Sequence, residues 1–455
     1  MKVDVLIIGA GQAASPLARL LADKGQQVAL AEAEQIGGSC VNYGCTPSKT
    51  IIASAKVAHQ ARRSADYGIQ TGEVTVNFQK VLERAHDISA GMRNSNEKSL
   101  QRRHVKILRD YAVFEDAHHV RVGGQVVEAD RIYINTGTVG VVPDIPGLQD
   151  IPYLDEKRIL QLDTLPEHLV ILGGGYIGVE YAQAMRRLGS RVTVIHTGEQ
   201  ILSREDRDIA DSAREILEGE GIRFHLNTRT TRVEGEAGRV RLTLAGQDGT
   251  ETTIDGTHLM LAVGRKPASA GLGLEAAGVA LDDGGFIQVD DHLRTNVPHI
   301  YALGDVNGHG AFTHTSYDDF TIVADNLNGG DLTVSRRQTA YAVFMDPPLG
   351  RAGQTEKQVR ESGRKALMAT LPMTAVGRAK EYAQTLGFMK VLVDAETERI
   401  LGAALLGLDG DEVVSTIIGL MYADAPYTTL KNMVLIHPTV AELLPTMMTQ
   451  LKELE

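Results

Sequence analysis

The chain has 455 residues, of which 43% are apolar and 23% are charged, enough for two to four domains with large cores. Its formal net charge of −12 argues against nucleic acid as a main partner. No apolar run approaches the ~20 residues of a membrane span, and the first residues lack the basic segment of a signal peptide. We therefore expect a cytoplasmic protein that does not bind membranes.

The first thirty residues predict a βαβ unit that binds a dinucleotide. Residues 3–8 and 27–32 have the composition of buried strands, and a glycine-rich turn and a helical stretch lie between them. In such a unit Gly9 makes a tight turn and Gly11 lets the backbone approach a pyrophosphate, while Ala14 replaces the third glycine. The helix N-terminus then offers free N–H groups to the phosphates.

The only two cysteines of the chain, Cys40 and Cys45, follow this unit. A disulfide closing so short a loop gains little from chain entropy, and two thiolates alone do not make a structural metal site. In a regular helix the two Cα atoms would be about 7.5 Å apart, whereas a disulfide needs about 4.4–6.8 Å. Bridging them needs an irregular turn, which Gly44 and Pro47 suit. We therefore expect a redox-active pair; two buried inert thiols are the alternative.

Residues 56–105 have a helical pattern with many charged positions, which indicates a solvated helix face. Arg62 and Arg63 are candidates for contact with an anionic substrate, because they follow the cysteine segment closely.

A second βαβ unit repeats the first about 164 residues later. Residues 168–172 and 191–196 are its strands, and the turn between them carries Gly173, Gly175 and Gly178. In both units the first glycine lies 23 residues before the end of the second strand (9 to 32 and 173 to 196). One such motif is weak evidence, but two in full βαβ context predict two dinucleotide sites.

The residues that end these second strands differ. Glu32 stands where a carboxylate accepts hydrogen bonds from ribose hydroxyls, whereas His196 holds that place in the second unit. The acidic marker for NADH is therefore missing, and the second nucleotide is predicted as NAD(P)H with a lean to the phosphorylated form. Arg191, Arg204 and Arg207 are candidates for a 2′-phosphate or are ordinary surface charges.

The rest of the chain predicts further sheets. A hairpin turn at 247–249 joins strands within residues 226–262, and more strands are expected at 341–344, 389–393 and 400–406. A helix at 411–423 and a last helix with Met447 and Met448 carry an apolar stripe, which we expect at a subunit interface.

These motifs together resemble the FAD-dependent pyridine nucleotide–disulfide oxidoreductases, which include dihydrolipoamide dehydrogenase, glutathione reductase and mercuric reductase. The resemblance covers essentially the whole chain. Besides the two fingerprints and the cysteine segment, it rests on the matching stretches 135–137, 263–267, 295–298, 301–305 and 437–442. The local sequence is most similar to that of a mercuric-reductase-like branch, although the last five residues hold no cysteine pair.

The resemblance implies an α/β fold with two Rossmann-like dinucleotide-binding domains and a C-terminal α+β dimerisation domain. The expected boundaries are residues 1–148 and 268–335 for FAD, 149–267 for NAD(P) and 336–455 for dimerisation.

The resemblance also implies the residues that bind the cofactors. Glu32 would bind the ADP half of FAD, Ala112 the adenine and Asp305 the ribitol, while Thr313 would place a backbone amide near the isoalloxazine. Lys49 would approach flavin N5 and pair with Glu180, and Tyr176 would be a lid that NAD(P)H displaces. The remaining expected contacts of the two nucleotides are Gly9, Gly11, Ala14, Gly38, Ser39, Thr136, Gly137, Gly173, Gly175, Gly178, His196, Val233, Gly264 and Arg265; no metal site is expected.

The implied activity is electron transfer from NAD(P)H through FAD to a Cys40–Cys45 disulfide. Cys45 would lie next to the flavin, and Cys40 would meet the acceptor. Because thiolate is the reactive form, a base must take the proton; His437, oriented by Glu442, is the candidate. In the family this histidine comes from the partner subunit, so we expect a homodimer with a shared active site.

The terminal acceptor is left open between a disulfide, a soft metal ion and a small thiol-reactive oxidant. Two alternatives remain beside this reading: a dihydrolipoamide dehydrogenase, and a flavin-bound redox sensor that acts through partner binding.

Overall fold

The computed structural model describes residues 1–454 and divides the chain into two compact units. The first unit comprises Met1–Thr50, Lys80–Val141 and Gly264–Arg337, and the second comprises Ile51–Gln79, Val142–Val263 and Gln338–Glu455. The expected NAD(P)-binding and dimerisation domains fall mainly in the second unit. The three-domain division and its boundaries stay a prediction.

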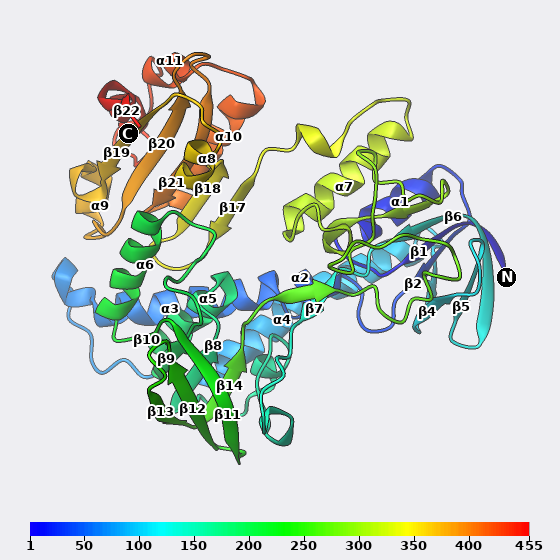
Figure 1. The fold of residues 1–455 in the computed structure, drawn as a ribbon, viewed down its shortest axis with the longest axis horizontal. Coiled ribbons are helices and arrows are strands. Elements are labelled where there is room, and N and C mark those ends of the chain that lie inside the picture. The colour runs from blue at the N-terminus through cyan, green and yellow to red at the C-terminus, as the bar shows by residue number, and fades with distance from the viewer. Residues whose placement is uncertain (455) are drawn as a thin grey trace. The chain divides into compact units, whose positions relative to one another are not determined.

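A seven-stranded mixed sheet organises the first unit (Figure 1). Its order is β3-β2-β1-β6-β5-β4, and β16 also pairs with β6. All pairs are parallel except those that β5 makes with β4 and β6. The strands are β1 Lys2–Ile8, β2 Val28–Ala31, β3 Lys106–Leu108, β4 Ala112–Phe114, β5 His119–Val122, β6 Gln125–Ile134 and β16 Ile300–Ala302; the short strands β7 Thr138–Gly140 and β15 Arg265–Pro267 form a separate antiparallel pair.

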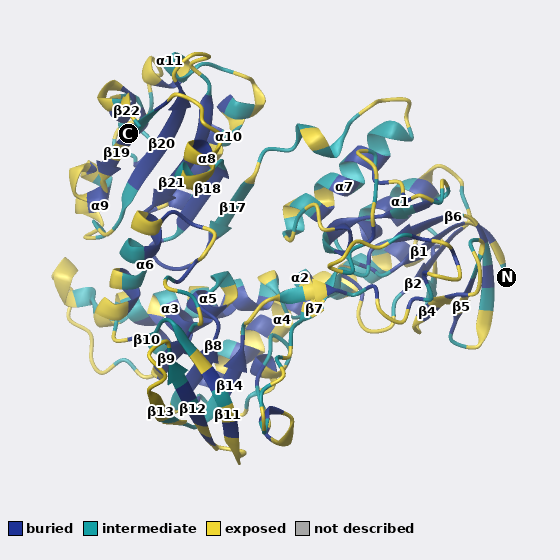
Figure 2. Cartoon of the chain, in the orientation of Figure 1, coloured by how far each residue is buried: buried dark blue, intermediate teal, exposed yellow. Residues whose placement is uncertain are grey.

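Side chains of β1 pack on both faces of this sheet, as expected for a parallel sheet covered on each side. Leu6 and Ile8 join one buried cluster, and Val5 and Ile7 join the other. Figure 2 shows this central strand region as buried. The helices that begin in this unit or lie in it are α1 Ala14–Asp23, α2 Gly38–Asn42, α3 Cys45–Arg62, α4 Phe78–Gln101 and α7 Thr313–Asn326. The first predicted βαβ unit is confirmed.

The second unit holds three sheets, of which two belong to the middle of the chain. A parallel sheet of order β10-β9-β8-β14 contains the second βαβ unit, and an antiparallel sheet β11-β12-β13 contains the predicted hairpin. Both predictions are confirmed. The elements are β8 His168–Leu172, α5 Tyr176–Leu188, β9 Arg191–Ile195, α6 Arg207–Gly219, β10 Arg223–His225, β11 Thr228–Glu236, β12 Arg239–Gly246, β13 Glu251–Gly256 and β14 His258–Leu261.

The third sheet is antiparallel and has the order β17-β18-β21-β20-β19-β22. It includes the three strands predicted near the C-terminus. Its elements are β17 Ala340–Val343, β18 Leu349–Gly353, α8 Glu356–Glu361, β19 Ala366–Pro372, α9 Gly377–Glu381, β20 Phe388–Asp394, β21 Ile400–Leu406, α10 Gly410–Tyr422, α11 Tyr427–Lys431, α12 Leu443–Met447 and β22 Lys452–Glu453. Short 3₁₀ helices complete the chain: η1 Ser64–Tyr67, η2 Leu148–Asp150, η3 Arg158–Gln161, η4 Gly304–Asn307, η5 Val334–Arg336, η6 Met373–Ala375 and η7 Met448–Gln450.

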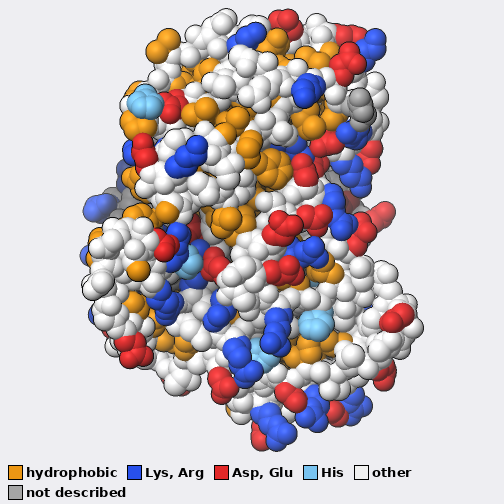
Figure 3. All heavy atoms as spheres, turned by 90° about the vertical axis from the view of Figure 1, so that its left-hand side faces the viewer, with side chains coloured by type: hydrophobic (Ala, Val, Ile, Leu, Met, Phe, Trp, Pro, Cys, Tyr) orange, Lys and Arg blue, Asp and Glu red, His pale blue; other side chains and the backbone are white. Residues whose placement is uncertain are grey.

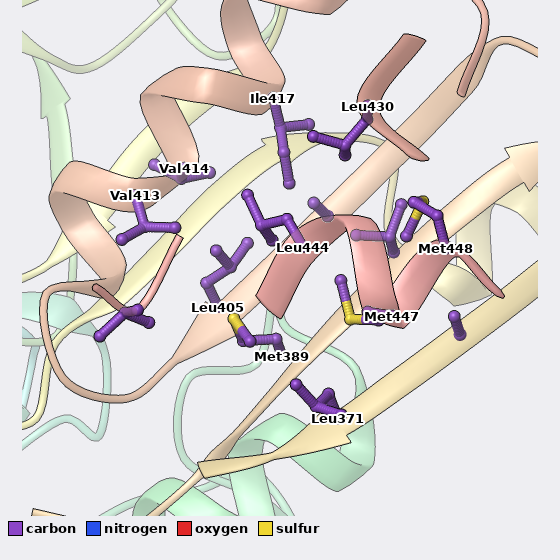
Figure 4. Packing of buried hydrophobic residues seen from close by; sticks show 14 of the residues in the cluster. Leu371, Met389, Leu405, Val413, Val414, Ile417, Leu430, Leu444, Met447 and Met448 are labelled. Carbon is purple, nitrogen blue, oxygen red and sulfur yellow. The ribbon is translucent and has the colours of Figure 1, made fainter. Parts of the chain in front are cut away.

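The expectation that the apolar stripe of the last helices lies at a subunit interface is wrong for its central residues. Ile417, Met447 and Met448 are 0%, 0% and 2% exposed within a single chain. They pack with Leu405 and Leu444 in the core of the third sheet (Figure 4). Since a side chain already buried in its own subunit has no surface left for a partner, this stripe stabilises the subunit fold.

The continuous helical pattern expected at 56–105 is also corrected. Helix α3 ends at Arg62 and α4 begins at Phe78, with η1 and a segment without regular structure between them. Gly68, at φ +74°, ends η1 in a left-handed conformation that favours glycine. The segment 69–77 follows it.

Within residues 1–454, no helix combines the length and apolarity that a membrane crossing needs. Figure 3 shows basic and acidic side chains interspersed over the face that it presents.

Candidate functional site

The first glycine turn forms a cradle between β1 and α1. A Cβ atom on Gly9 would lie 2.4 Å from the carbonyl oxygen of Asn135, and one on Gly11 would lie 2.5 Å from the Oδ1 atom of the same residue. The Asn135 side chain also accepts a hydrogen bond from the Ala14 N–H (3.2 Å) and donates one to the Leu303 carbonyl (2.6 Å). Only glycine lets the turn pack this closely on the chain after β6.

Glu32 lies directly after β2, beside this turn. Its two carboxylate oxygens accept hydrogen bonds from the backbone N–H groups of Ala10 (2.9 Å) and Glu34 (2.8 Å). Burial raises the pKa of Glu32 above its usual value, and these hydrogen bonds oppose that change. The carboxylate is thus fixed at the place where the sequence predicts a ribose contact.

The chain after β6 supplies a second side of the cradle. The buried Thr136 hydroxyl has no hydrogen-bond partner among residues 1–454. A buried hydroxyl without a partner is costly, so a bound polar group such as a pyrophosphate fits this position. The Thr138 hydroxyl donates to Asp305 (3.1 Å) and accepts from Arg265 (2.9 Å), and burial raises the pKa of Asp305. The residues present therefore fit FAD.

Two helices meet at the cysteines. Cys40 lies in α2 and Cys45 is the first residue of α3, and no disulfide joins them in this structure. Regular helix is interrupted between α2 and α3 at Tyr43 and Gly44, where the Gly44 N–H donates to the Ser39 carbonyl (2.6 Å). The predicted irregularity between the cysteines is confirmed.

The two thiols differ in their surroundings. A hydrogen bond with Cys45, together with burial, raises the pKa of the Cys40 thiol well above its usual range. The Cys45 Sγ atom lies 3.2 Å from the Thr313 hydroxyl at the start of α7. The sequence singled out Thr313 for its backbone amide only; its hydroxyl contact with a sulfur needed the structure.

The second glycine turn packs in the same way as the first. A Cβ atom on Gly173 would lie 2.2 Å from the Ala262 carbonyl oxygen, and one on Gly178 would lie 2.0 Å from the Gly173 carbonyl oxygen. Nothing lies within 4 Å of the corresponding position on Gly175, so this edge of the turn is open to a ligand. This arrangement fits the pyrophosphate of NAD(P)H at the N-terminus of α5.

His196 takes the structural place of Glu32 in this second turn. Its Nδ1 atom accepts a hydrogen bond from the Gly174 N–H (3.2 Å), just as Glu32 accepts one from the Ala10 N–H. Burial lowers the pKa of His196, so the ring is neutral at pH 7 and its proton is on Nε2. The ring therefore carries no negative charge toward a nucleotide.

The C-terminal segment carries the predicted base. His437 Nδ1 lies 2.8 Å from Glu442 Oε2, and the His437 side chain is 82% exposed. Val434 and Ile436 beside it are 99% and 79% exposed. Bulky apolar side chains in a row on a surface are typical of a protein interface.

Several predicted site residues have side chains that are buried or engaged within the fold. Ala112 and Val233 are buried in strands β4 and β11, where their side chains pack in hydrophobic cores. Arg62 donates to the Arg187 carbonyl, and Arg63 donates to the Asp66 carboxylate and the Ala383 carbonyl. Because both guanidinium groups are engaged within the fold, the structure gives no support to their contact with an anionic substrate.

A family model described as pyridine nucleotide-disulphide oxidoreductase matches residues 3–319, and one for the dimerisation domain of the same family matches residues 339–448. This chain belongs to the pyridine nucleotide-disulphide oxidoreductases. As a member of this family it is an FAD-containing enzyme that transfers electrons from NAD(P)H to a disulfide, and its dimerisation domain makes it a homodimer.

Three comparisons show the range of this oxidoreductase family around the chain. RclA of Escherichia coli (strain K12), named a probable pyridine nucleotide-disulfide oxidoreductase, is 37% identical over 99% of this chain and 100% of its own. A mercuric reductase of Streptomyces lividans is 34% identical over 90% of this chain and 88% of its own. A solved structure of Escherichia coli RclA, described as the Cu(II) complex of a HOCl-induced flavoprotein disulfide reductase, matches with a TM-score of 0.89 at 36% identity, covering 98% of this chain and 99% of that one.

One cluster in this oxidoreductase resembles a metal site in composition. Asp206, Asp208 and Glu356 place ligand oxygens within 4.8 Å of one another. The Lys390 ammonium lies among them, at 3.2, 2.8 and 3.0 Å from these carboxylates. A cation of the chain itself therefore already contacts all three carboxylates.

Asn135 was not predicted from the sequence as a separate site residue. Its side chain joins the first glycine turn to Leu303, the residue after β16, through the two hydrogen bonds described above. The signal was present, since an amide residue directly after a buried strand and before Thr136 and Gly137 is well placed to bond with backbone groups.

Proposed function

We propose that Cys40 and Cys45 are the redox pair of this enzyme and that it delivers electrons from NAD(P)H to a thiophilic metal ion. The observation that carries the proposal is the hydrogen-bonded contact of the two cysteines at the break between α2 and α3, with the Thr313 hydroxyl 3.2 Å from the Cys45 sulfur. The cradle formed by Gly9, Gly11 and Thr136 supports an FAD site in the same compact unit.

The proposed cofactor roles follow from the contacts described above. Glu32 holds the ribose of the ADP half of FAD, Asp305 holds the ribitol, and the open edge at Gly175 receives the pyrophosphate of NAD(P)H. FAD supplies the two-electron step between the nicotinamide and the disulfide. We also propose that Lys49 pairs with Glu180. The proposed domains are an FAD-binding domain of residues 1–148 and 268–335, an NAD(P)-binding domain of residues 149–267 and a dimerisation domain of residues 336–455.

Cys40 is the thiol that meets the acceptor, and it needs a base. Its raised pKa keeps it protonated at neutral pH, whereas the thiolate is the reactive form. His437 of the second subunit takes this proton, and Glu442 stabilises the imidazolium that results. The exposed Val434 and Ile436 support this arrangement, because a second copy of the chain would cover them.

A thiophilic metal ion suits a site with two thiols and no further cysteine. The relatives point the same way: the RclA structure is a Cu(II) complex, and a mercuric reductase is 34% identical. Oxidation of the dithiol to the disulfide releases two electrons, which reduce two Cu(II) ions to Cu(I) or one Hg(II) ion to Hg(0).

The test is steady-state oxidation of NADPH and NADH with Cu(II), Hg(II), lipoamide or oxidised glutathione as acceptor. We expect turnover with a metal ion, and its loss in Cys45→Ser and Cys40→Ser enzymes that retain FAD. Turnover with lipoamide alone would identify a dihydrolipoamide dehydrogenase instead. Undiminished turnover in both cysteine variants would overturn the role of the pair.

A further inference from the structure

Tyr176 adjoins the glycine turn that we propose as the second nucleotide site. It is the first residue of α5 and directly follows the glycine turn at 173–175. Its hydroxyl lies 3.4 Å from Glu205 Oε1, and its ring lies 5.3 Å from the Tyr341 ring. The Tyr176 side chain therefore points to a defined partner.

Glu205 is held rigidly at this place. Its Oε2 atom accepts hydrogen bonds from Arg351 Nε (3.0 Å) and Nη2 (2.5 Å), and its Oε1 atom accepts one from the Tyr341 hydroxyl (2.7 Å). The side chains of Glu205 and Arg351 are 0% and 1% exposed. Such a buried, hydrogen-bonded ion pair has one well-defined geometry.

The partners come from different parts of the second unit. Glu205 lies just before α6, next to the parallel sheet, whereas Tyr341 is in β17 and Arg351 in β18 of the third sheet. The carboxylate that faces Tyr176 is thus positioned by the C-terminal sheet.

We propose that Glu205 is a positioning residue for NAD(P)H binding, acting as a latch that holds the Tyr176 side chain until the nicotinamide dinucleotide displaces it. The inference rests on the proposed function, in which NAD(P)H binds at the turn before α5.

The unequal distances at Oε1 explain why such a latch can open. The 2.7 Å bond from Tyr341 is short, whereas the 3.4 Å bond from Tyr176 is at the limit of a hydrogen bond. When Tyr176 leaves, Arg351 still neutralises the carboxylate and Tyr341 still donates to it. Opening therefore leaves no buried charge without a partner.

The protonation state of Tyr176 suits this role. Burial, and next the negative charge of Glu205, raise the pKa of Tyr176 to about 12. The phenol therefore stays protonated near neutral pH and can donate to the carboxylate.

The test is stopped-flow reduction of the FAD-loaded enzyme by NADH and by NADPH, which gives an apparent dissociation constant and a limiting rate. Tyr176→Phe removes the latch hydroxyl, so we expect the dissociation constant to fall about fivefold, the range that one weak hydrogen bond allows. Glu205→Gln weakens the hydrogen-bond acceptor of Tyr176, so we expect a similar fall in the dissociation constant. In the Tyr176→Phe background the same substitution should have no effect on the dissociation constant. Tyr382→Phe, on the exposed surface of the same unit, is the control and should change nothing.

Because Glu205→Gln leaves the buried Arg351 with only the longer contact to Asp206 (3.4 Å) as a counter-charge, the same cycle is also run with Tyr341→Phe, which keeps the ring. Effects of either substitution that persist unchanged in the Tyr176→Phe background overturn the latch, as does a Tyr176→Phe enzyme with an unchanged dissociation constant. Failure of the unsubstituted enzyme to be reduced by either nucleotide would instead overturn the proposed function, and the latch with it.

Discussion

At the scale of single residues, the Cys40 thiol decides how the proposed reaction depends on pH. Its pKa is raised by the hydrogen bond with Cys45 and by burial. A thiol with a raised pKa is protonated below that pKa, so the reactive thiolate becomes more populated as the pH rises. Acceptor reduction should therefore accelerate with increasing pH, and a base that takes the proton should allow it to proceed near neutrality.

This argument predicts the behaviour of His437→Ala. Removing the base should slow acceptor reduction about 100-fold at pH 7, and the loss should shrink as the pH rises and the thiol ionises unaided. Rapid-mixing measurements of the two half-reactions between pH 6 and pH 9 check this, with reduction by NADPH as the internal control. Equal slowing of both half-reactions at every pH would exclude His437 as the base.

His196 offers a second prediction at this scale. Because His196 and Glu32 accept equivalent backbone hydrogen bonds, a carboxylate can replace the imidazole without loss of the turn. His196→Glu should then favour NADH over NADPH about tenfold, since it adds an acceptor for ribose hydroxyls and repels a 2′-phosphate. The ratio of kcat/KM values for the two nucleotides measures this; an unchanged ratio would remove His196 from the specificity site.

At the scale of elements, the break between α2 and α3 brings the cysteines together. A Cβ atom on Gly44 would lie 2.9 Å from the Ser39 carbonyl oxygen and 3.3 Å from the Cys40 Cα atom. Gly44→Ala should therefore push the helices apart, destabilise the fold by about 1–3 kcal/mol and slow formation of the disulfide.

The matched control is Gly91→Ala in the middle of α4, where an added Cβ meets nothing within 4 Å. That change should stabilise the protein by about 0.5–1 kcal/mol, as alanine does in a helix interior. Thermal unfolding and thiol titration after mild oxidation distinguish the two variants. A Gly44→Ala protein that forms its disulfide as fast as the Gly91→Ala protein would contradict the packing argument.

The helices and strands also show which structural features could be predicted from the sequence. Strands such as β1 and β8 and the turns after them were predictable, because buried-strand composition followed by glycines at fixed spacing admits few folds. The stripe with Ile417 and Met447 was misplaced, since an apolar helix face has the same pattern whether it packs on its own sheet or on a partner. The contact between Thr313 and Cys45 was out of reach, because 268 residues separate them and no local pattern encodes the meeting.

At the scale of the whole molecule, the homodimer determines where the proposed active site is completed. The dimerisation domain contributes the exposed segment with Val434, Ile436 and His437. If His437 serves the cysteines of the other subunit, each site needs both chains.

Hybrid dimers test this sharing. Cys45→Ser and His437→Ala subunits are each impaired alone, but a dimer of one of each contains one site with an intact cysteine pair and an intact histidine. Co-expression with two affinity tags should therefore restore acceptor reduction in the doubly purified hybrid. A hybrid no more active than the better of its two parents would place His437 and the cysteines of one subunit in the same site.

The central claim, that electrons pass through FAD to the Cys40–Cys45 pair, is tested most directly by anaerobic titration of the oxidised, FAD-loaded enzyme with NADPH. The account predicts that each subunit consumes about two equivalents, one for the flavin and one for the disulfide, because each is a two-electron acceptor. The Cys45→Ser enzyme should consume about one. Consumption of a single equivalent by the unsubstituted enzyme, equal to that of the variant, would contradict the account.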